Sequence, residues 1–344
     1  MELEEASVTA DRRRSPAINK FSIGKYSGVL IFALIVLVFG IWTPDTFLTA
    51  TNFRSILASQ AIIAILALGL LFPLAAGAFD LSAAQNLGFC AVLCGALLTK
   101  NELPVPIAIA IALGAGIVVG MFNGFLVAVI GINSFIATLG TTSLLTAGSQ
   151  VLTDGTYLGP FPDSFQDLTS GAFFTLPVIV IYLFVFAVIA WFVLEHTPLG
   201  RRIYAAGANA DAARLTGVNT TRMVFGSLVI SGFAAAVAGV LLASTLGSVS
   251  SSLGPEYLLP AFAGAFLGTT QLKPGRFNVG GTMLAIFLLG TGVQGLQLVG
   301  GEVWVTALFN GVALIVAVGA VLFVRRLQDR RATRRPAQGS RSKS

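Results

Sequence analysis

Residues 61–98 read AIIAILALGLLFPLAAGAFDLSAAQNLGFCAVLCGALL, two apolar runs joined by a short segment that contains a single aspartate. Each run is close to the 20 or so residues that a helix needs to cross a hydrocarbon layer roughly 30 Å thick. Between them, AAGAFDLS (75–82) interrupts the helical pattern at a depth where freed backbone groups need partners in protein or in a water-filled cavity. The stretch therefore predicts two membrane helices separated by a break.

The composition of the whole chain predicts a protein that crosses a membrane many times. Of 344 residues, 55% are hydrophobic and 10% are charged, whereas soluble domains carry about 25% charged residues. The apolar runs bounded by Gly, Pro or charge predict ten spans. These are 26–42, 56–76, 82–99, 105–130, 134–153, 176–195, 222–247, 256–271, 280–299 and 303–324. The expected fold class is all-α and polytopic, with about ten transmembrane helices.

The positions of the basic residues predict how the spans are oriented. The net charge of +6 comes from clusters beside apolar runs, as expected of cytoplasmic segments rather than of a nucleic-acid-binding surface. The clusters lie at 12–25, 201–222, 273–276 and 325–343, and an even number of spans puts both chain ends inside. We expect a basic cytoplasmic tail at 1–25, a membrane domain at 26–324 with a cytoplasmic loop at 197–221, and a disordered basic cytoplasmic tail at 325–344 that contacts membrane lipid.

Several predicted spans are short or interrupted, which is typical of helices that line a transport pathway. Breaks are expected at 75–82, at TAGSQVLTDG (146–155), and on both sides of the eighth span, at LGPEY (253–257) and QLKPG (271–275). A faint similarity between FNGFLVAVIG (122–131) and VQGLQLVGG (293–301) suggests two related helical bundles. For most of the 38 glycines, close helix packing is the alternative explanation.

A basic segment at 200–218, GRRIYAAGANADAARLTGV, interrupts the apolar pattern. Asn209 is placed to cap a short helix with Asp211 in its first turn and Arg214 in its last, and Gly217 can end it in a left-handed conformation. A helix of about seven residues is marginal alone in water, so we expect it to pack on something. An ordinary loop made basic for topology is the alternative.

The run TPLGRRIYAAGANADAARLTGVN (197–219) resembles the cytoplasmic loop of ribose-type sugar permeases, the membrane subunits of ATP-binding-cassette importers, and DAARLTG (211–217) is similar to their coupling loops. GAFDLSAA (77–84), SFIATLGT (134–141) and VISGFAAAVAGVL (229–241) resemble three further segments of that family, so the similarity covers most of the chain. The resemblance implies a type II importer fold and a helix that docks in a groove of an ATPase subunit. The residues implied in this coupling are Arg201, Arg202, Asn209, Asp211, Ala212, Ala213, Arg214 and Gly217. A buried charge at Ala213 is expected to uncouple transport without preventing insertion.

The chain departs from the family pattern around the aspartate of the first stretch. Phe79 and Ala84 stand where isoleucine and glycine are usual, and Gln85 and Asn86 add polarity to the third span. Asp80 is an ionisable residue in an apolar context, which is costly and usually functional. Either it contacts a substrate, or it caps the helix that begins near position 81; we favour capping.

A pathway for a sugar needs neutral hydrogen-bonding groups that bind weakly. The candidate pathway residues are the acidic Asp80 and eight neutral polar residues: Gln85, Asn86, Asn123, Ser134, Thr138, Thr141, Gln294 and Asn310. Each of them is equally suited to joining helices, because an interhelical hydrogen bond in a membrane contributes about 0.6 to 2 kcal/mol.

The chain contains no Gly-x-x-x-x-Gly-Lys-Ser/Thr motif, so we expect no enzyme activity, and ATP bound and hydrolysed by a separate subunit. No metal and no cofactor of its own are expected. The resemblance implies a monosaccharide such as ribose as substrate, the bacterial inner membrane as location, and three kinds of partner: cytoplasmic ATPase subunits, a second permease subunit and an extracytoplasmic sugar-binding protein. A branched-chain amino acid or nucleoside permease is the alternative within that superfamily. An ion-coupled secondary transporter is a further alternative, which the scarcity of charged residues in the spans disfavours.

Overall fold

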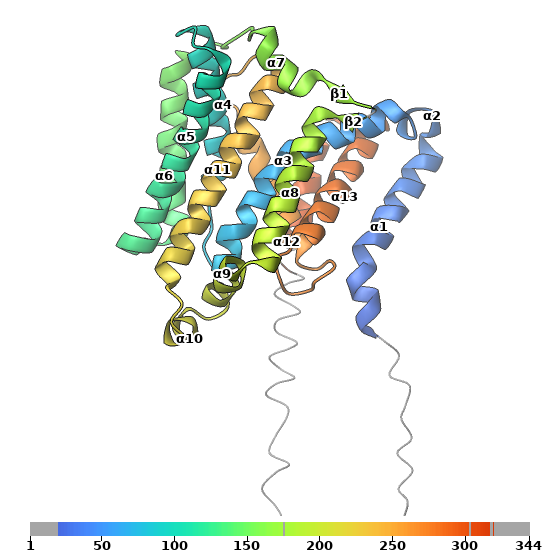
Figure 1. The fold of residues 1–344 in the computed structure, drawn as a ribbon. Helices are drawn as coiled ribbons and strands as arrows, with labels where there is room; N and C mark the ends of the chain where they lie inside the picture. The colour runs from blue at the N-terminus through green and yellow to red at the C-terminus, as the bar shows by residue number, and fades with distance from the viewer. Residues whose placement is uncertain (1–19, 175, 303, 317–318, 320–344) are drawn as a thin grey trace, which may run out of the picture.

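The structure, a computed structural model, describes residues 20–174, 176–302, 304–316 and 319, and nearly all its regular structure is helical (Figure 1). The labelled helices are α1 (Lys20–Trp42), α2 (Pro44–Phe47), α3 (Ala50–Ala76), α4 (Ala83–Thr99), α5 (Val105–Gly124), η1 (Phe125–Ile130, a π-helix), α6 (Ser134–Thr153), α7 (Asp163–Ser170), α8 (Val178–His196), α9 (Pro198–Ala208), α10 (Ala210–Leu215), α11 (Thr220–Leu246), η2 (Pro255–Tyr257, a 3-10 helix), α12 (Leu258–Gly268) and α13 (Val279–Leu298). A further apolar helix spans Trp304–Val316. Strands β1 (Ala172–Phe173) and β2 (Leu176–Pro177) form a small antiparallel pair.

Each of the ten predicted spans corresponds to a helix in the part of the chain that the structure describes. Six helical segments are long and apolar enough to cross a membrane: 50–76, 105–130, 134–153, 178–196, 220–246 and 279–298. The shorter apolar helices at 28–42, 83–99 and 304–316, together with α12, account for the other four. The all-α, polytopic fold is therefore confirmed. The predicted tail at 325–344 and residues 1–19 lie outside the described residues.

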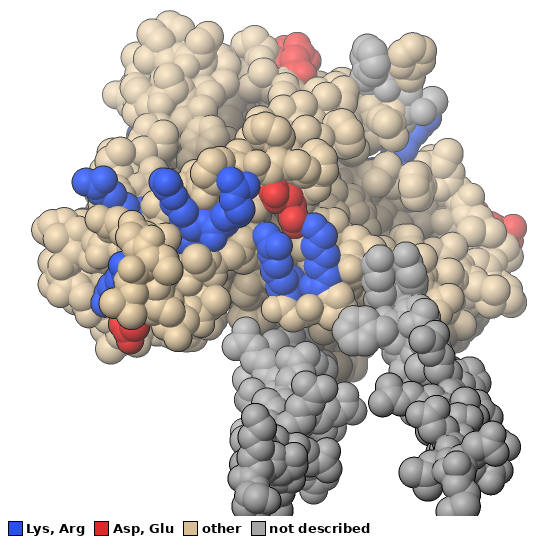
Figure 2. Space-filling view, turned by 60° about the horizontal axis from the view of Figure 1, so that its bottom comes forward, with Lys and Arg blue, Asp and Glu red and all other residues tan. Residues whose placement is uncertain are grey.

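The two ends of the molecule differ in their connections. In Figure 1, α9, α10 and the loop between α12 and α13 lie at one end of the bundle, and α2, α7 and the β1–β2 pair lie at the other. Figure 2 shows lysine and arginine side chains gathered on the first of these ends. We call this end, which carries Arg201, Arg202 and Lys273, the basic end. Its connections are those that the charge pattern predicts to share one side of the membrane.

Helices α3 and α11 form the centre of the bundle. Helix α11 contacts α3, α4 and α5, and α3 also contacts α8, α9, α12 and α13. The crossing of α11 with α5 depends on small residues, because a Cβ added at Gly232 would lie 2.4 Å from the carbonyl oxygen of Gly116. Membrane helices associate through such close backbone approach. The packing role considered for most glycines applies at this crossing.

Most of the predicted interruptions are present, and one is absent. Residues 77–82 are not helical, and the 11-residue helix α12 lies between η2 and an irregular loop at 269–278. The expected break at 146–155 is wrong, since α6 continues to Thr153. The hydroxyls of Thr146, Ser149 and Thr153 donate to carbonyl oxygens four residues earlier in the same helix. These polar side chains are therefore satisfied without interrupting the helix.

Candidate functional site

The break between α3 and α4 is held by a row of hydroxyls on α6. Ser134, Thr138 and Thr142 are spaced by four residues, so they lie on one face of the helix. The Phe79 N–H donates to Ser134 Oγ (3.1 Å), and the Leu81 N–H donates to Thr138 Oγ1 (3.1 Å). The Thr142 hydroxyl donates to the Leu81 carbonyl oxygen (3.3 Å). This hydroxyl ladder, Ser134–Thr138–Thr142, supplies the partners that a non-helical backbone needs within a membrane.

Asp80 is buried at the centre of a polar network. One carboxylate oxygen accepts from the Ser82 N–H (3.1 Å) and hydroxyl (2.7 Å), and the other accepts from the Ser231 hydroxyl of α11 (2.7 Å). The Asn123 amide of α5 donates to Ser82 Oγ (2.7 Å) and accepts from the Thr141 hydroxyl of α6 (2.6 Å). The network joins three helices to the break. The carboxylate binds Ser82, the residue just before the first turn of α4, and bridges it to Ser231 of α11.

The other candidate pathway residues are spread through the bundle. The Asn86 side chain is buried and donates to the carbonyl oxygens of Gly232 (3.2 Å) and Gly116 (3.5 Å). Gln294 donates to Asn52 Oδ1 (3.1 Å), which joins α13 to α3, and Asn310 is buried in the last helix. In the described part of the chain, the buried Nε2 of Gln85 has no hydrogen-bond partner. The fold brings Asp80, Asn123, Thr138 and Thr141 together and leaves Gln294 and Asn310 elsewhere.

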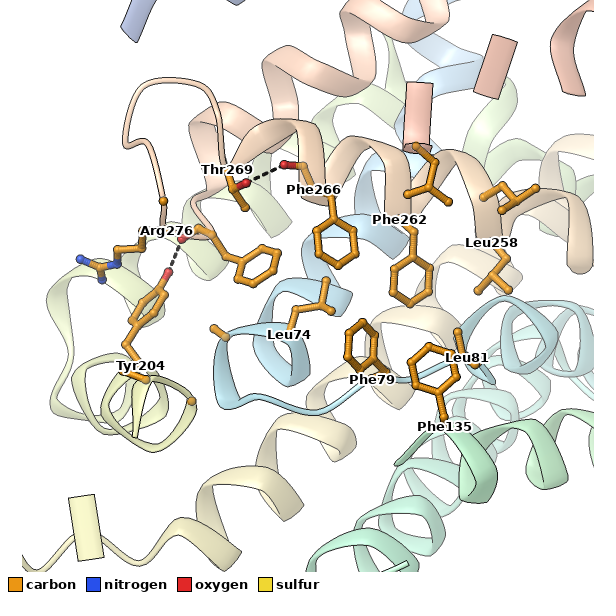
Figure 3. Close-up of a pocket in the computed structure, with 17 residues that line it drawn as sticks. Leu74, Phe79, Leu81, Phe135, Tyr204, Leu258, Phe262, Phe266, Thr269 and Arg276 are labelled. Carbon is orange, nitrogen blue, oxygen red and sulfur yellow. Dashed lines mark hydrogen bonds between the residues drawn. The ribbon is translucent and has the colours of Figure 1, made fainter. Parts of the chain in front are cut away.

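A cavity of about 850 Å³ lies beside the break (Figure 3). One wall is α12, and the other is formed by the end of α3, the break and the start of α6. The lining consists mostly of aliphatic and aromatic side chains, and it includes none of the nine polar candidates among the described residues: Leu74, Ala75, Phe79, Leu81, Phe135, Tyr204, Gly207, Ala208, Leu258, Leu259, Phe262, Phe266, Thr269, Gly275, Arg276, Phe277 and Leu314. Its volume falls within the roughly 300 to 1,000 Å³ of small-molecule sites.

Four of the five phenylalanines among the described lining residues come from the two walls of this cavity. Phe79 comes from the break, Phe135 from α6, and Phe262 and Phe266 from α12. The centroid of the Phe79 ring lies 4.8 Å from that of Phe135, 6.5 Å from that of Phe262 and 6.4 Å from that of Phe266. The sequence marks only Phe79, as a departure from the family pattern. Phe135 of α6 and the two rings of α12 come from parts of the chain far from each other, and only the fold brings them together.

Helix α9 closes the cavity at the basic end. Gly207 packs on the end of α3, where a Cβ added to it would lie 2.1 Å from the Ala75 carbonyl oxygen. The Tyr204 hydroxyl donates to the Phe277 carbonyl oxygen in the loop after α12, and the Arg276 guanidinium carbon lies 3.8 Å from the centre of the Tyr204 ring. Burial raises the pKa of Tyr204, so its hydroxyl remains protonated, and able to donate, at neutral pH. Helix α9 therefore contacts the end of α3 on one side of the cavity and the loop that follows α12 on the other.

A carboxylate at the end of α8 is bound to the same loop. The Glu195 side chain is only 9% exposed, and its Oε2 lies 2.6 Å from Lys273 Nζ and 3.8 Å from the Arg276 guanidinium. Figure 2 shows acidic atoms among the basic side chains of this face. Because the carboxylate is largely shielded from solvent, its ion pairs are less screened than pairs on an open surface. They hold the loop at 269–278 close to α8 and α9.

The short helix predicted in the basic segment is present as α10, with six residues. The Asn209 side chain accepts from the Ala212 N–H (3.0 Å), which is the predicted cap. Asp211 lies in the first turn and Arg214 in the last, 3.6 Å apart at their charged groups. Gly217 has a φ of +83° and ends the helix in the left-handed region. The local expectations for this segment are confirmed.

The residues that α10 exposes differ from those predicted to contact a partner. Ala213 is buried, and α10 packs against α9 and α11 of its own chain, so a charge at Ala213 would disturb that packing before it reached any partner. Ala212 is exposed, and Leu215 is 91% exposed. Leu215 was not among the predicted residues, because the sequence does not show which side of so short a helix faces its own chain. The exposed arginines at 201 and 202 lie in the preceding helix.

Comparison with known proteins identifies relatives along most of the chain. A family model described as branched-chain amino acid transport system / permease component matches residues 52–318. The chain is 32% identical over 299 residues to the autoinducer 2 import system permease protein LsrD of Salmonella typhimurium, covering 85% of this chain and 89% of that protein. It is 31% identical over 305 residues to the ribose import permease protein RbsC of Haemophilus influenzae, covering 88% and 94% respectively. No solved structure matches the chain. The polytopic helical fold and these matches agree, and the chain belongs to the family of membrane permease components of branched-chain amino acid type transport systems.

Proposed function

We propose that this chain is the membrane-spanning permease subunit of an ATP-binding-cassette importer for a monosaccharide such as ribose. The observation that carries the proposal is the similarity, over most of the chain, to import permeases, one of which is a ribose permease aligned over 94% of its length. The chain supplies the pathway and transmits force. ATP is bound and hydrolysed by a separate subunit, because the chain has no Gly-x-x-x-x-Gly-Lys-Ser/Thr loop.

The lining of the cavity favours a neutral cargo over an amino acid. An amino acid carries two charges that need partners along the path, such as paired charges or helix ends. Among the described lining residues, the only charged side chain is Arg276, at the basic end, and there is no carboxylate. A branched-chain amino acid, which the family description names, is therefore the less favoured cargo for this chain.

The partner surface that we propose is the basic end of the molecule. Leu215 is apolar but 91% exposed, and it lies on a short helix of this end beside arginines, a residue type that is enriched at interface hot spots. We assign Leu215, Ala212 and the surrounding arginines to the ATPase contact, with this end in the cytoplasm together with both chain termini. A sugar-binding protein would dock at the opposite end, and a second permease subunit would complete the pathway.

Uptake of labelled ribose tests the proposed cargo and energy source. The full chain is co-expressed with its candidate ATPase and binding protein and reconstituted in liposomes. We expect ribose accumulation that requires ATP and continues when the proton gradient is discharged. Accumulation that survives ATP depletion but collapses with the proton gradient would identify an ion-coupled carrier and contradict the proposal. ATP-driven uptake of leucine in place of ribose would contradict the proposed cargo alone.

Leu215→Glu tests the partner surface. Because a charge without a partner is costly when a contact buries it, we expect recovery of the ATPase with the tagged permease to fall roughly tenfold or more. Tyr157→Glu is the matched control, since Tyr157 is 77% exposed in the segment between α6 and α7, and α7 lies at the opposite end of the bundle. Both variants should insert normally. Equal ATPase recovery with Leu215→Glu and wild type would exclude Leu215 from the contact.

A further inference from the structure

The polar groups of the cavity lie at one end of it. Tyr204, Thr269 and Arg276 are the polar side chains among its described lining residues, and all three lie toward the basic end (Figure 3). Two of them are already engaged, because the Tyr204 hydroxyl donates to the Phe277 carbonyl oxygen and the Thr269 hydroxyl donates to the Phe266 carbonyl oxygen (2.7 Å). The deeper part therefore offers apolar side chains, which do not hold a sugar by hydrogen bonds.

Phe79 joins the two walls of this apolar part. Its ring contacts Phe135 on the α6 side and both Phe262 and Phe266 on the α12 side, whereas no direct ring contact joins Phe135 to either ring of α12 within the described residues. The backbone of Phe79 is fixed by its N–H bond to Ser134, the residue next to Phe135. The first turn of α6 thus positions both parts of Phe79: Ser134 binds its backbone, and the Phe135 ring packs against its side chain.

Both walls are also connected to α9. The Ala75 carbonyl, against which Gly207 packs, belongs to a residue four positions before Phe79 in the chain. On the other wall, Tyr204 binds the loop that follows Phe266 and the end of α12. A displacement of α9 therefore acts on the two sides of the ring cluster at once, through one backbone contact and one hydrogen bond.

We propose that Phe79, Phe135, Phe262 and Phe266 form the selective constriction of the transport pathway, with Phe79 as its specificity-determining residue. Where the rings meet, at centroid distances of 4.8, 6.4 and 6.5 Å, they would leave a narrow apolar passage, which loses its water and blocks charged solutes. Separation of the walls by α9 admits a neutral solute past the rings. The inference rests on the proposed transport function in one respect: the cavity is taken to be part of the pathway.

Passive leak through Phe79→Ala tests the constriction. The full-length variant is reconstituted in liposomes without ATP, ribose influx is followed by light scattering, and proton influx is followed with a trapped pH-sensitive dye. Removing a ring that makes three aromatic contacts should raise both rates about tenfold or more, a factor that corresponds to about 1.4 kcal/mol in the closed-to-open equilibrium. Phe79→Leu retains an apolar plug and should leak less than Phe79→Ala.

A second variant keeps the test valid if Phe79→Ala folds poorly. Phe135→Ala removes the ring whose centroid lies 4.8 Å from that of Phe79. The Phe135 side chain is 45% exposed, so its removal should disturb the packing less. Its matched control is Phe125→Ala, which removes a ring that is 49% exposed and does not line the cavity. We expect Phe135→Ala to leak and Phe125→Ala to remain as tight as wild type.

The possible results separate this inference from the proposed function. Tight membranes with both Phe79→Ala and Phe135→Ala, together with normal ATP-driven ribose uptake, would show that the rings only pack the bundle. An equal leak with the Phe125→Ala control would also overturn the constriction, since general loosening would then explain it. A third result is that neither the wild type nor any variant accumulates ribose with ATP, while Phe79→Ala still leaks. The proposed cargo or the proposed energy source would then be wrong, and the constriction would stand.

Discussion

At the scale of single residues, the burial of Asp80 is made possible by the number of its partners. A buried carboxylate without donors is strongly destabilising, whereas hydrogen bonds to an ionised group contribute more than neutral ones. Asp80 accepts from two groups of Ser82 and from Ser231, and these donors belong to the break and to α11. The residue therefore connects the irregular segment to the centre of the bundle.

Replacing Asp80 distinguishes a structural role from substrate contact. Asp80→Ala leaves three buried donors without an acceptor, so we expect stability to fall by about 3 kcal/mol or more, at 1 to 3 kcal/mol for each unsatisfied group. Asp80→Asn preserves the shape and should cost less. Thermal unfolding in detergent measures the first effect, and the KM for ribose uptake, measured on the folded fraction, should remain unchanged. A tenfold higher KM with unchanged stability would instead place Asp80 in contact with the substrate.

The sequence predicts single residues well where the cause is local. The cap at Asn209 and the left-handed Gly217 follow from positions along the chain, and the structure contains both. The aromatic lining of the cavity does not follow in this way, because Phe79 and Phe262 are separated by most of the chain and meet only through packing. The polar candidates chosen from the sequence also do not line the cavity among the described residues. Polar side chains in a bundle are satisfied first by one another, as Asn123 and Thr141 are.

At the scale of elements, α9 is the part of the structure that joins the proposed partner surface to the cavity. It leads into α10 on one side, and it contacts α3, α8 and α11 on the other. Its contact with α3 is backbone against backbone at Gly207, so a shift of α9 would press directly on the end of α3 with no flexible side chain between them. Its contact with the loop after α12 passes through Tyr204.

Gly207→Ala tests this connection. Because the added Cβ would lie 2.1 Å from the Ala75 carbonyl oxygen, either α9 or the end of α3 must shift. We expect ATP hydrolysis by the assembled complex to continue while ribose transported per ATP falls several-fold. Gly226→Ala, at the basic end of α11, is the matched control, since a Cβ there meets nothing within 4 Å. Parallel assays of ATPase activity and uptake measure the ratio. An unchanged ratio would show that this contact does not transmit force.

At the scale of the whole molecule, the charge pattern and the fold give a consistent arrangement of the two ends. Alternation of the ten helices places α9, α10 and the loop at 269–278 at one end, and that end carries the basic clusters of the loops. The number and order of the spans could be predicted because hydrophobicity and length decide them. The position of α12 and the path of the segment before it, which runs beside α4, could not be predicted. They depend on close contacts such as that of Gly88 with the Leu253 carbonyl.

Cysteine labelling measures the orientation of the molecule. Leu215→Cys should react with a membrane-impermeant maleimide in inside-out vesicles and remain unlabelled in intact cells. Tyr157→Cys, exposed at the opposite end, should show the reverse pattern. Background labelling should be low, because Cys90 and Cys94 are both buried. Labelling of Leu215→Cys from outside would invert the proposed topology and move the ATPase contact to another part of the chain.

The hydroxyl ladder of α6 also determines which genetic changes the chain can tolerate. Its three hydroxyls meet the break only because they recur every four residues on one helical face. Exchange of serine for threonine at these positions keeps the register, but a one-residue insertion between 134 and 142 rotates the following positions by about 100°. Thr142 would then turn away from Leu81, and backbone groups at membrane depth would lose their partners. Insertions and deletions should accordingly be tolerated in the exposed loops of this protein and eliminated from this turn of α6, even where substitutions persist.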